Sequence, residues 1–297
     1  MATIRVGFIK YANSLPFYHS FDSPGLIDSI DGVLKTSGSA LNLIENIEFE
    51  LIYDSPAQLN KLISDGMLDI ATISTYEYVK NRAGLQMVGN IGICAHKSVM
   101  SVLLVSNRNI NQLSGCDILL SNESASAASL LKILTGDYFD NNDIKFTAGS
   151  VRAEQIDKIV SENNVSAIMV IGDEALKYCE LSQKAGGAAN KIIIYDLCSL
   201  WNHFTSLPFV FGVFAARADF YFNNKTICDL TGSAVKSKIN FFNSNKNIFA
   251  DYASKHSKIN EAILRRYYDI LSYDITPDHI MAVEEYEKRL KKIKLLP

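Results

Sequence analysis

The chain has 297 residues, of which 48% are hydrophobic and 21% charged, and its formal net charge is −3. This length predicts two domains of ordinary size or one large α/β unit, and the balanced charge argues against a nucleic-acid or membrane partner. The five cysteines are odd in number and lack a C-x-x-C spacing, so we expect reduced thiols and no metal site.

Two features of the sequence bear on localisation. Residues 1–20 lack the basic start, the long apolar run and the cleavage site of a secretory signal. No segment approaches the roughly 20 consecutive apolar residues that a bilayer-spanning helix needs. We therefore expect a cytoplasmic protein.

The first element is a strand over residues 4–9, a nearly continuous apolar run that is typical of a buried parallel strand. Asn13 or Ser14 can cap the helix that follows, with Pro16 tolerated in its first turn. The free backbone N–H groups at such a helix start stabilise a carboxylate. This junction is the first candidate ligand site.

The same pattern returns at Ser74. After an irregular segment over 22–38 and a short helix over 40–46, we expect strands over 48–53 and 68–74 with a helix over 56–65 between them. Ligands of parallel α/β sheets bind outside the carboxyl ends of the strands, so we expect Asn13 and Ser74 to line one cleft.

A second βα region follows a hinge predicted at 89–96. The polar stretch 121–126 starts a helix, and its small side chains suit either an anion site or an ordinary helix cap. The apolar segment 201–214 is interpreted as a buried return to the first region. We expect further strands at 100–106, 118–120, 143–147, 167–171 and 191–196, and helices at 127–134, 152–163, 172 onward, 233–242, 248–255, 260–271 and 278–292.

Common catalytic motifs are absent from the sequence. It contains no Walker A, dinucleotide-binding, nucleophile-elbow or H-E-x-x-H motif. Of the five scattered histidines, only His96 and His203 fall near the expected crossings between the two regions. Cys94 lies in the expected hinge, where packing is favoured over reactivity.

Four segments together resemble the chorismate dehydratases of the futalosine route to menaquinone. They occur in the order expected for that family and are Val6–Pro16 (VGFIKYANSLP), Asp69–Tyr78 (DIATISTYEY), Val170–Leu176 (VIGDEAL) and Leu207–Phe211 (LPFVF). The helical end of the chain is similar too, so the resemblance covers nearly all of the sequence.

The resemblance implies an α/β, two-lobed fold like the type II periplasmic binding proteins, each lobe a mixed sheet flanked by helices, with a helical C-terminal region. Residues 1–93 and 208–297 would form one lobe and 94–207 the other, with the cleft between them. The implied reaction removes water from chorismate to give 3-[(1-carboxyvinyl)oxy]benzoate without a metal or cofactor. The substrate's own enolpyruvyl carboxylate would act as the base.

The resemblance also assigns site residues. Asn13 and Ser74 match the family's catalytic positions. The residues expected to bind substrate are Tyr11, Ser14, Thr75, Cys94, Ser124, Ser126 and Asp173. The sequence departs from the family pattern at two places: Cys94 stands in place of serine, and Ser126-Ala127 stands in place of Thr-Ser. Each departure removes or weakens a hydroxyl that could hold or polarise the substrate.

Two alternatives stay open. The sister enzyme, 1,4-dihydroxy-6-naphthoate synthase, shares the implied fold, but its opening Cys-Pro-Asn-Asp run is absent here. The other alternative is a non-catalytic solute-binding protein for a small carboxylate, and the missing secretory signal argues against an exported one. The sequence gives no prediction of oligomeric state.

Overall fold

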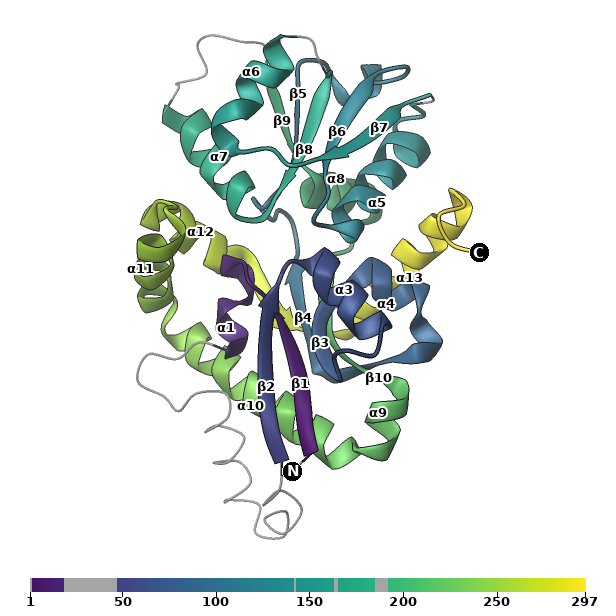
Figure 1. Ribbon diagram of the computed structural model, residues 1–297. Coiled ribbons are helices and arrows are strands. Elements are labelled where there is room, and N and C mark those ends of the chain that lie inside the picture. The colour runs from purple at the N-terminus through teal and green to yellow at the C-terminus, as the bar shows by residue number, and fades with distance from the viewer. Residues whose placement is uncertain (1, 19–46, 142, 163–164, 185–191) are drawn as a thin grey trace.

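The computed structural model describes residues 2–18, 47–141, 143–162, 165–184 and 192–297. Two sheets, each flanked by helices, form two lobes that lie one above the other in Figure 1. The predicted strand over 48–53 is present, whereas the predictions for 22–38 and 40–46 lie outside the described residues.

The first lobe is built on a six-stranded mixed sheet of order β11-β4-β10-β3-β1-β2. β1 is parallel to β2 and β3, and its alternate residues Ile4, Val6 and Phe8 are buried. The strands are β1 (Ala2–Ile9), β2 (Ile47–Asp54), β3 (Ile70–Ser74), β4 (Leu85–Ala95), β10 (Phe209–Arg217) and β11 (Leu271–Asp274).

Helices from both ends of the chain cover this sheet. α3 packs on β1 and β3, and α10 packs on β4 (Figure 1). Among the described residues, no helix is long and apolar enough to cross a bilayer. The helical elements are η1 (Ala12–Ser14), α1 (Leu15–Tyr18), α3 (Pro56–Ser64), α4 (Thr75–Lys80), η3 (Arg82–Gly84), α9 (Ala218–Asn223), α10 (Lys225–Ser244), α11 (Lys246–Ser257), α12 (Glu261–Ile270) and α13 (Pro277–Lys292).

The second lobe is built on a five-stranded mixed sheet of order β7-β6-β8-β5-β9. Its strands are β5 (Val102–Ser106), β6 (Asp117–Ser121), β7 (Lys145–Gly149), β8 (Ala167–Ile171) and β9 (Ile193–Asp196). Its helical elements are η4 (Ile110–Gln112), α5 (Ala125–Ile133), η5 (Leu134–Tyr138), η6 (Ala153–Gln155), α6 (Ile156–Ser161), α7 (Gly172–Lys184) and α8 (Leu197–Thr205). α12 contacts α7 and α13 contacts α5, so the C-terminal helices also join the two lobes.

The hinge predicted at 89–96 is wrong, because β4 continues to Ala95 and pairs with both β10 and β11. Gly92 is needed for close strand approach within this segment, because a Cβ on it would lie 2.8 Å from the carbonyl oxygen of Gly212 in β10. The chain crosses between the lobes at 96–101 and returns at 206–208. The lobe boundary proposed at 93 therefore falls inside β4, and the one at 208 lies just before β10.

The C-terminal region is helical except for one element that the sequence analysis missed. The short strand β11 extends the first sheet at its edge beside β4. The predicted helix over 233–242 lies in the second half of the longer α10. The apolar segment 201–214 includes the end of α8 and the first part of β10, a strand in the middle of the sheet.

Candidate functional site

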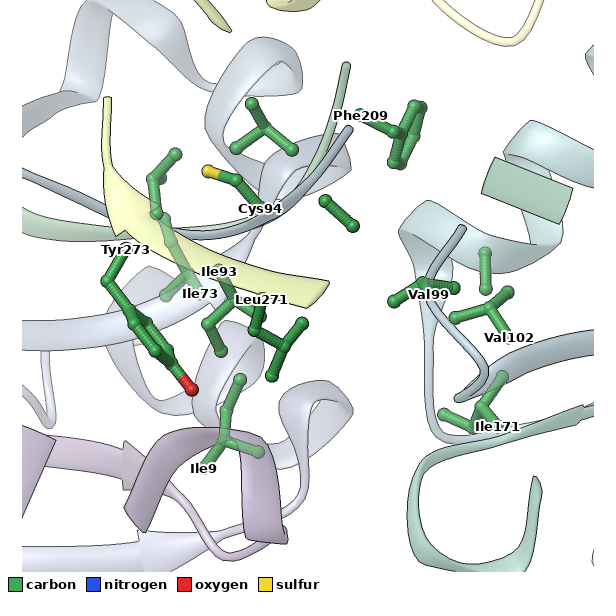
Figure 2. Packing of buried hydrophobic residues seen from close by; sticks show 14 of the residues in the cluster. Ile9, Ile73, Ile93, Cys94, Val99, Val102, Ile171, Phe209, Leu271 and Tyr273 are labelled. Atoms are coloured by element: carbon green, nitrogen blue, oxygen red, sulfur yellow. The ribbon is translucent and has the colours of Figure 1, made fainter. Parts of the chain in front are cut away.

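A small cavity of about 40 Å³ lies between the two lobes, at the ends of β1, β3 and β8. Its walls are mainly apolar: Ile9 and Ile93 lie on the first-lobe side, and Val99, Val102 and Ile171 lie opposite (Figure 2). The residues that line the cavity are Ile9, Tyr11, Asn13, Pro56, Ser74, Ile93, Val99, Ser101, Val102, Ser124, Ile171, Gly172, Phe211 and Gly212. Four predicted site residues, Tyr11, Asn13, Ser74 and Ser124, are among them.

Asn13 lies in η1, directly after the first strand, and tyrosines from the C-terminal region hold it there. The hydroxyl of Tyr273 donates to the Asn13 carbonyl at 3.0 Å, and that of Tyr268 donates to the Ala12 carbonyl at 3.1 Å. The Asn13 side chain also hydrogen-bonds to Tyr267. Its Oδ1 is buried and has no partner among the described residues, so this acceptor is available to a ligand.

Ser74 ends β3 and caps α4. Its hydroxyl oxygen accepts a hydrogen bond from the backbone N–H of Glu77 at 3.2 Å and another from Asn60 Nδ2 at 2.8 Å. The side chain is almost completely buried. This serine is therefore fixed by two elements, its own helix and α3.

Ser124 and Ser126 lie at the start of α5 but differ in position. Ser124 caps the helix by accepting from the backbone N–H of Ala127 at 3.2 Å, and it lines the cavity. Ser126 is buried, and its hydroxyl accepts from the backbone N–H of Tyr76 at 3.0 Å, which ties α5 to α4 across the lobes. Ser126 does not line the cavity.

Ser101 lines the cavity and was missed by the sequence analysis. Its hydroxyl accepts from the buried hydroxyl of Tyr267 at 3.0 Å, and its carbonyl accepts from the backbone N–H of Gly172 at 2.8 Å. Tyr267 comes from α12, so the contact joins residues 166 positions apart. The sole local signal was a serine directly before a strongly apolar strand.

Tyr11 forms the wall between this cavity and a larger polar one of about 400 Å³. Its hydroxyl donates to Glu123, and its ring packs against Gly172, where an added Cβ would lie 3.3 Å from the ring. Gly172 has φ +61°, a conformation that favours glycine. Burial, followed by the Glu123 hydrogen bond, raises the pKa of Tyr11, so the phenol is protonated at neutral pH.

Asp173 supports this wall from the second lobe without lining the apolar cavity. Its Oδ1 accepts from the backbone N–H of Ala12 at 3.3 Å. Burial raises the pKa of the carboxyl, and the hydrogen bond from Ala12 opposes that shift. Asp173 lines the polar cavity behind Tyr11.

Three further predicted residues, Ser14, Thr75 and Cys94, do not line the cavity. The hydroxyls of Ser14 and Thr75 are buried and have no partner among the described residues. Cys94 is fully buried, because successive side chains of a strand point to opposite faces and its neighbour Ile93 takes the cavity face (Figure 2). Their proposed substrate contacts stay predictions.

The histidines singled out by sequence lie away from the cavity lining. The ring of His96 packs edge-on against that of His279, and the ring of His203 packs against Phe204. In the described ranges, no group of three or more His, Cys, Asp or Glu side chains is placed to hold a metal ion.

Among the described residues, the cavity lining contains no charged side chain, and Tyr11 is its single titratable residue. The polar groups that reach it are hydroxyls and an amide. Such groups in a buried site can hold an anion or a polarised substrate by hydrogen bonds, because the low local dielectric strengthens them. None of them is a base at neutral pH.

Comparison with known proteins agrees with this architecture. The sequence matches the menaquinone biosynthesis family over residues 4–292. It is 25% identical over 225 residues to a chorismate dehydratase of Thermus thermophilus, covering 72% of this chain and 70% of the relative.

Solved structures share the fold. A protein of Archaeoglobus fulgidus has a TM-score of 0.69 at 16% identity, covering 99% of this chain and 98% of that one. The periplasmic aliphatic sulphonate-binding protein of Escherichia coli has a TM-score of 0.62 at 12% identity, covering 100% and 89%. The predicted periplasmic-binding-protein-like fold is confirmed, and the chain belongs to the menaquinone biosynthesis family.

Proposed function

We propose that the protein is a chorismate dehydratase of futalosine-dependent menaquinone biosynthesis, a carbon–oxygen lyase acting in the cytoplasm. Family membership and the Thermus thermophilus relative support this proposal. The observation that carries it is the cavity itself, whose described lining combines apolar walls for a carbon ring with hydroxyl and amide groups.

The apolar walls and neutral polar groups of the cavity suit a reaction whose product is aromatic. Chorismate loses a ring proton and the neighbouring hydroxyl group, and together these leave as one molecule of water. The C–H and C–O bonds break while the ring gains its third double bond. Aromatisation makes the step favourable, so positioning matters more than strong acid–base catalysis.

We assign the removal of the ring proton to the substrate's own enolpyruvyl carboxylate. Tyr11, the titratable residue of the lining, keeps its proton at neutral pH because burial and Glu123 raise its pKa. The carboxyl group that takes the ring proton would pass it to the departing hydroxyl group, which leaves as water. Asn13 would act as the orienting residue, since its unpaired Oδ1 can accept a hydrogen bond from the ring hydroxyl group of the bound substrate. Ser74, Ser101 and Ser124 line the cavity, and their hydroxyls would contact the carboxylates.

Substrate binding requires the two lobes to separate. The cavity of about 40 Å³ has room for a few waters, each of which needs about 10–15 Å³ of such space, and is far smaller than a ring dicarboxylate. The crossings at 96–101 and 206–208 are the backbone segments at which such an opening would occur.

The proposal is tested by incubating the purified protein with chorismate and following the aromatic product by chromatography and ultraviolet absorbance. We expect conversion by the wild-type protein and a loss of at least about a hundredfold in kcat with Asn13→Ala, whose thermal unfolding should stay close to wild type. Chorismate left unchanged by folded wild-type protein at high concentration would contradict the proposal. Unchanged kinetics of Asn13→Ala would assign Asn13 to structure.

A second candidate is a non-catalytic receptor for a small anion. It is favoured by the structural likeness to sulphonate-binding proteins. Calorimetry that finds tight binding of a carboxylate or sulphonate, with no turnover of chorismate, would support this candidate over the enzyme.

A further inference from the structure

Asn60 is a buried amide of α3 that uses both ends of its side chain on one residue. Its Oδ1 accepts from the backbone N–H of Ser74 at 2.9 Å, and its Nδ2 donates to the Ser74 hydroxyl oxygen at 2.8 Å. Asn60 is 8% exposed and Ser74 is 2% exposed. The pairing joins α3 to the end of β3, where Ser74 faces the cavity.

This pairing determines what the Ser74 hydroxyl can do. A serine hydroxyl has two acceptor positions and one proton. Asn60 Nδ2 occupies one acceptor position, and the backbone N–H of Glu77, at 3.2 Å, occupies the other. None of the hydrogen bonds among the described residues has the Ser74 hydroxyl as donor, so its proton is the part left for the cavity.

We propose that Asn60 is a positioning residue that makes Ser74 a donor toward a carboxylate of the substrate. This inference rests on the proposed function for the identity of that substrate. A carboxylate only accepts hydrogen bonds, so a hydroxyl whose lone pairs are already used is matched to it. If Ser74 were free to rotate, its oxygen could present a lone pair to the same carboxylate and repel it.

If Asn60 had a purely structural role, Asn60→Asp would leave the affinity for a carboxylate unchanged. The bond from the Ser74 backbone N–H to Asn60 Oδ1 by itself ties α3 to β3. Asn60→Asp keeps this acceptor but replaces the Nδ2 donor by a second acceptor. The Ser74 hydroxyl would then donate to Asp at position 60, and its proton would be withdrawn from the cavity.

Asn141 provides a matched control in the second lobe. It is 6% exposed, its Oδ1 accepts from the backbone N–H of Leu113 at 3.1 Å, and its Nδ2 donates to the carbonyl of Ile110 at 2.7 Å. It does not line the cavity. Asn141→Asp therefore makes the same chemical change at similar burial without touching Ser74.

The experiment measures kcat and KM for chorismate, and the calorimetric Kd of the unreactive dicarboxylate isophthalate, for Asn60→Asp, Ser74→Ala, the double variant and Asn141→Asp. We expect Asn60→Asp to raise KM and Kd about ten- to a hundredfold, with a smaller change in kcat. The double variant should lie within about twofold of Ser74→Ala. Asn141→Asp should lose thermal stability but keep both constants.

Two results would overturn the inference. One is an unchanged Kd in Asn60→Asp, and the other is an equal loss of affinity when Asn60→Asp is made in the Ser74→Ala background. Wild-type protein that binds isophthalate but leaves chorismate unchanged would overturn the proposed function alone, and the variants' Kd values would still decide the role of Asn60. Wild-type protein that binds neither dicarboxylate would overturn both.

Discussion

The β3–α4 and β6–α5 junctions are alike in sequence, since each places a helix-capping serine after a strand, but the structure holds the two serines differently. Ser74 is almost fully buried and accepts two hydrogen bonds. Ser124 is partly exposed and accepts one, from the backbone N–H of Ala127. A capping pattern therefore predicts the junction, whereas a second, distant partner makes one of the two hydroxyls rigid.

Between the two junction serines, the larger effect is expected for Ser74→Ala, which removes the rigid hydroxyl. We expect kcat/KM for chorismate to fall about a hundredfold, as for the loss of one preorganised donor. Loss of the cap should lower the free energy of unfolding by about 1 kcal/mol. Steady-state kinetics and denaturant unfolding measure the two effects. A smaller loss of kcat/KM than in Ser124→Ala would contradict the expectation that Ser74 contributes more than Ser124.

The next largest effect is expected at Asp196, which supports the second-lobe wall. It accepts from the backbone N–H groups of Val99 and Met100 at 2.9 and 2.8 Å and caps α8 through Ser199. Met100 has φ +59°, so these bonds hold the crossing in an uncommon conformation.

We expect Asp196→Ala to lower the free energy of unfolding by about 2–3 kcal/mol, because it leaves two buried backbone donors unpaired. Denaturant unfolding with Asp196→Asn as the conservative control measures this, since the asparagine keeps an acceptor oxygen. Equal stability of Asp196→Ala and wild type would mean that the crossing is held by its other contacts.

Ser124→Ala should have a smaller effect than Ser74→Ala on both measurements. Its hydroxyl has one partner and is partly exposed, so we expect a loss of less than about tenfold in kcat/KM and about 1 kcal/mol in stability. A hundredfold kinetic loss would show that the two junctions contribute equally to binding.

The smallest expected effect is the pH dependence of the protein's stability that arises from Asp173. Because burial raises its pKa, the folded state holds this proton more tightly than the unfolded state does. Its contribution to stability is therefore most favourable at low pH and falls as pH rises from the ordinary carboxyl pKa through the raised one. Above that range the ionised, buried group is a cost to folding.

Asp173→Asn should remove this dependence while keeping an acceptor for the backbone N–H of Ala12. We expect the melting temperature of the variant, relative to wild type, to increase by about 2 °C between pH 4 and pH 7. Thermal unfolding of both proteins across this range measures it. A constant difference would assign the pH dependence to other groups.

The parts of the site that depend on local sequence were predictable. The strand-to-helix junctions at Asn13 and Ser74 were found because an apolar run followed by a capping residue is a short-range pattern, and the structure places both residues at the cavity. Ser101 and Phe211 were missed because they reach the cavity through the crossing segment and through β10, whose sheet partners lie far away in the sequence.

The sequence alone does not show which residues of a strand point into the cavity or which distant elements the strand contacts. The hinge predicted at 89–96 falls inside β4, where Gly92 allows the close approach of β10 and Gly89 lies against Gly232 of α10. Cys94 was expected at the cleft, whereas the alternation of β4 places Ile93 there. The helical C-terminal region was recognised, but not that Tyr267 reaches Ser101 and Tyr273 reaches Asn13.

The most direct test of the account is a single-turnover reaction of excess wild-type protein with chorismate from pH 6 to pH 9. None of the described residues that line the cavity titrates in this range, because the pKa of Tyr11 is raised above it. We predict complete conversion to 3-[(1-carboxyvinyl)oxy]benzoate at a rate that does not depend on pH. Unconverted chorismate would contradict the proposed activity, and a rate that rises with pH through a single pKa would contradict proton removal by the substrate's own carboxylate.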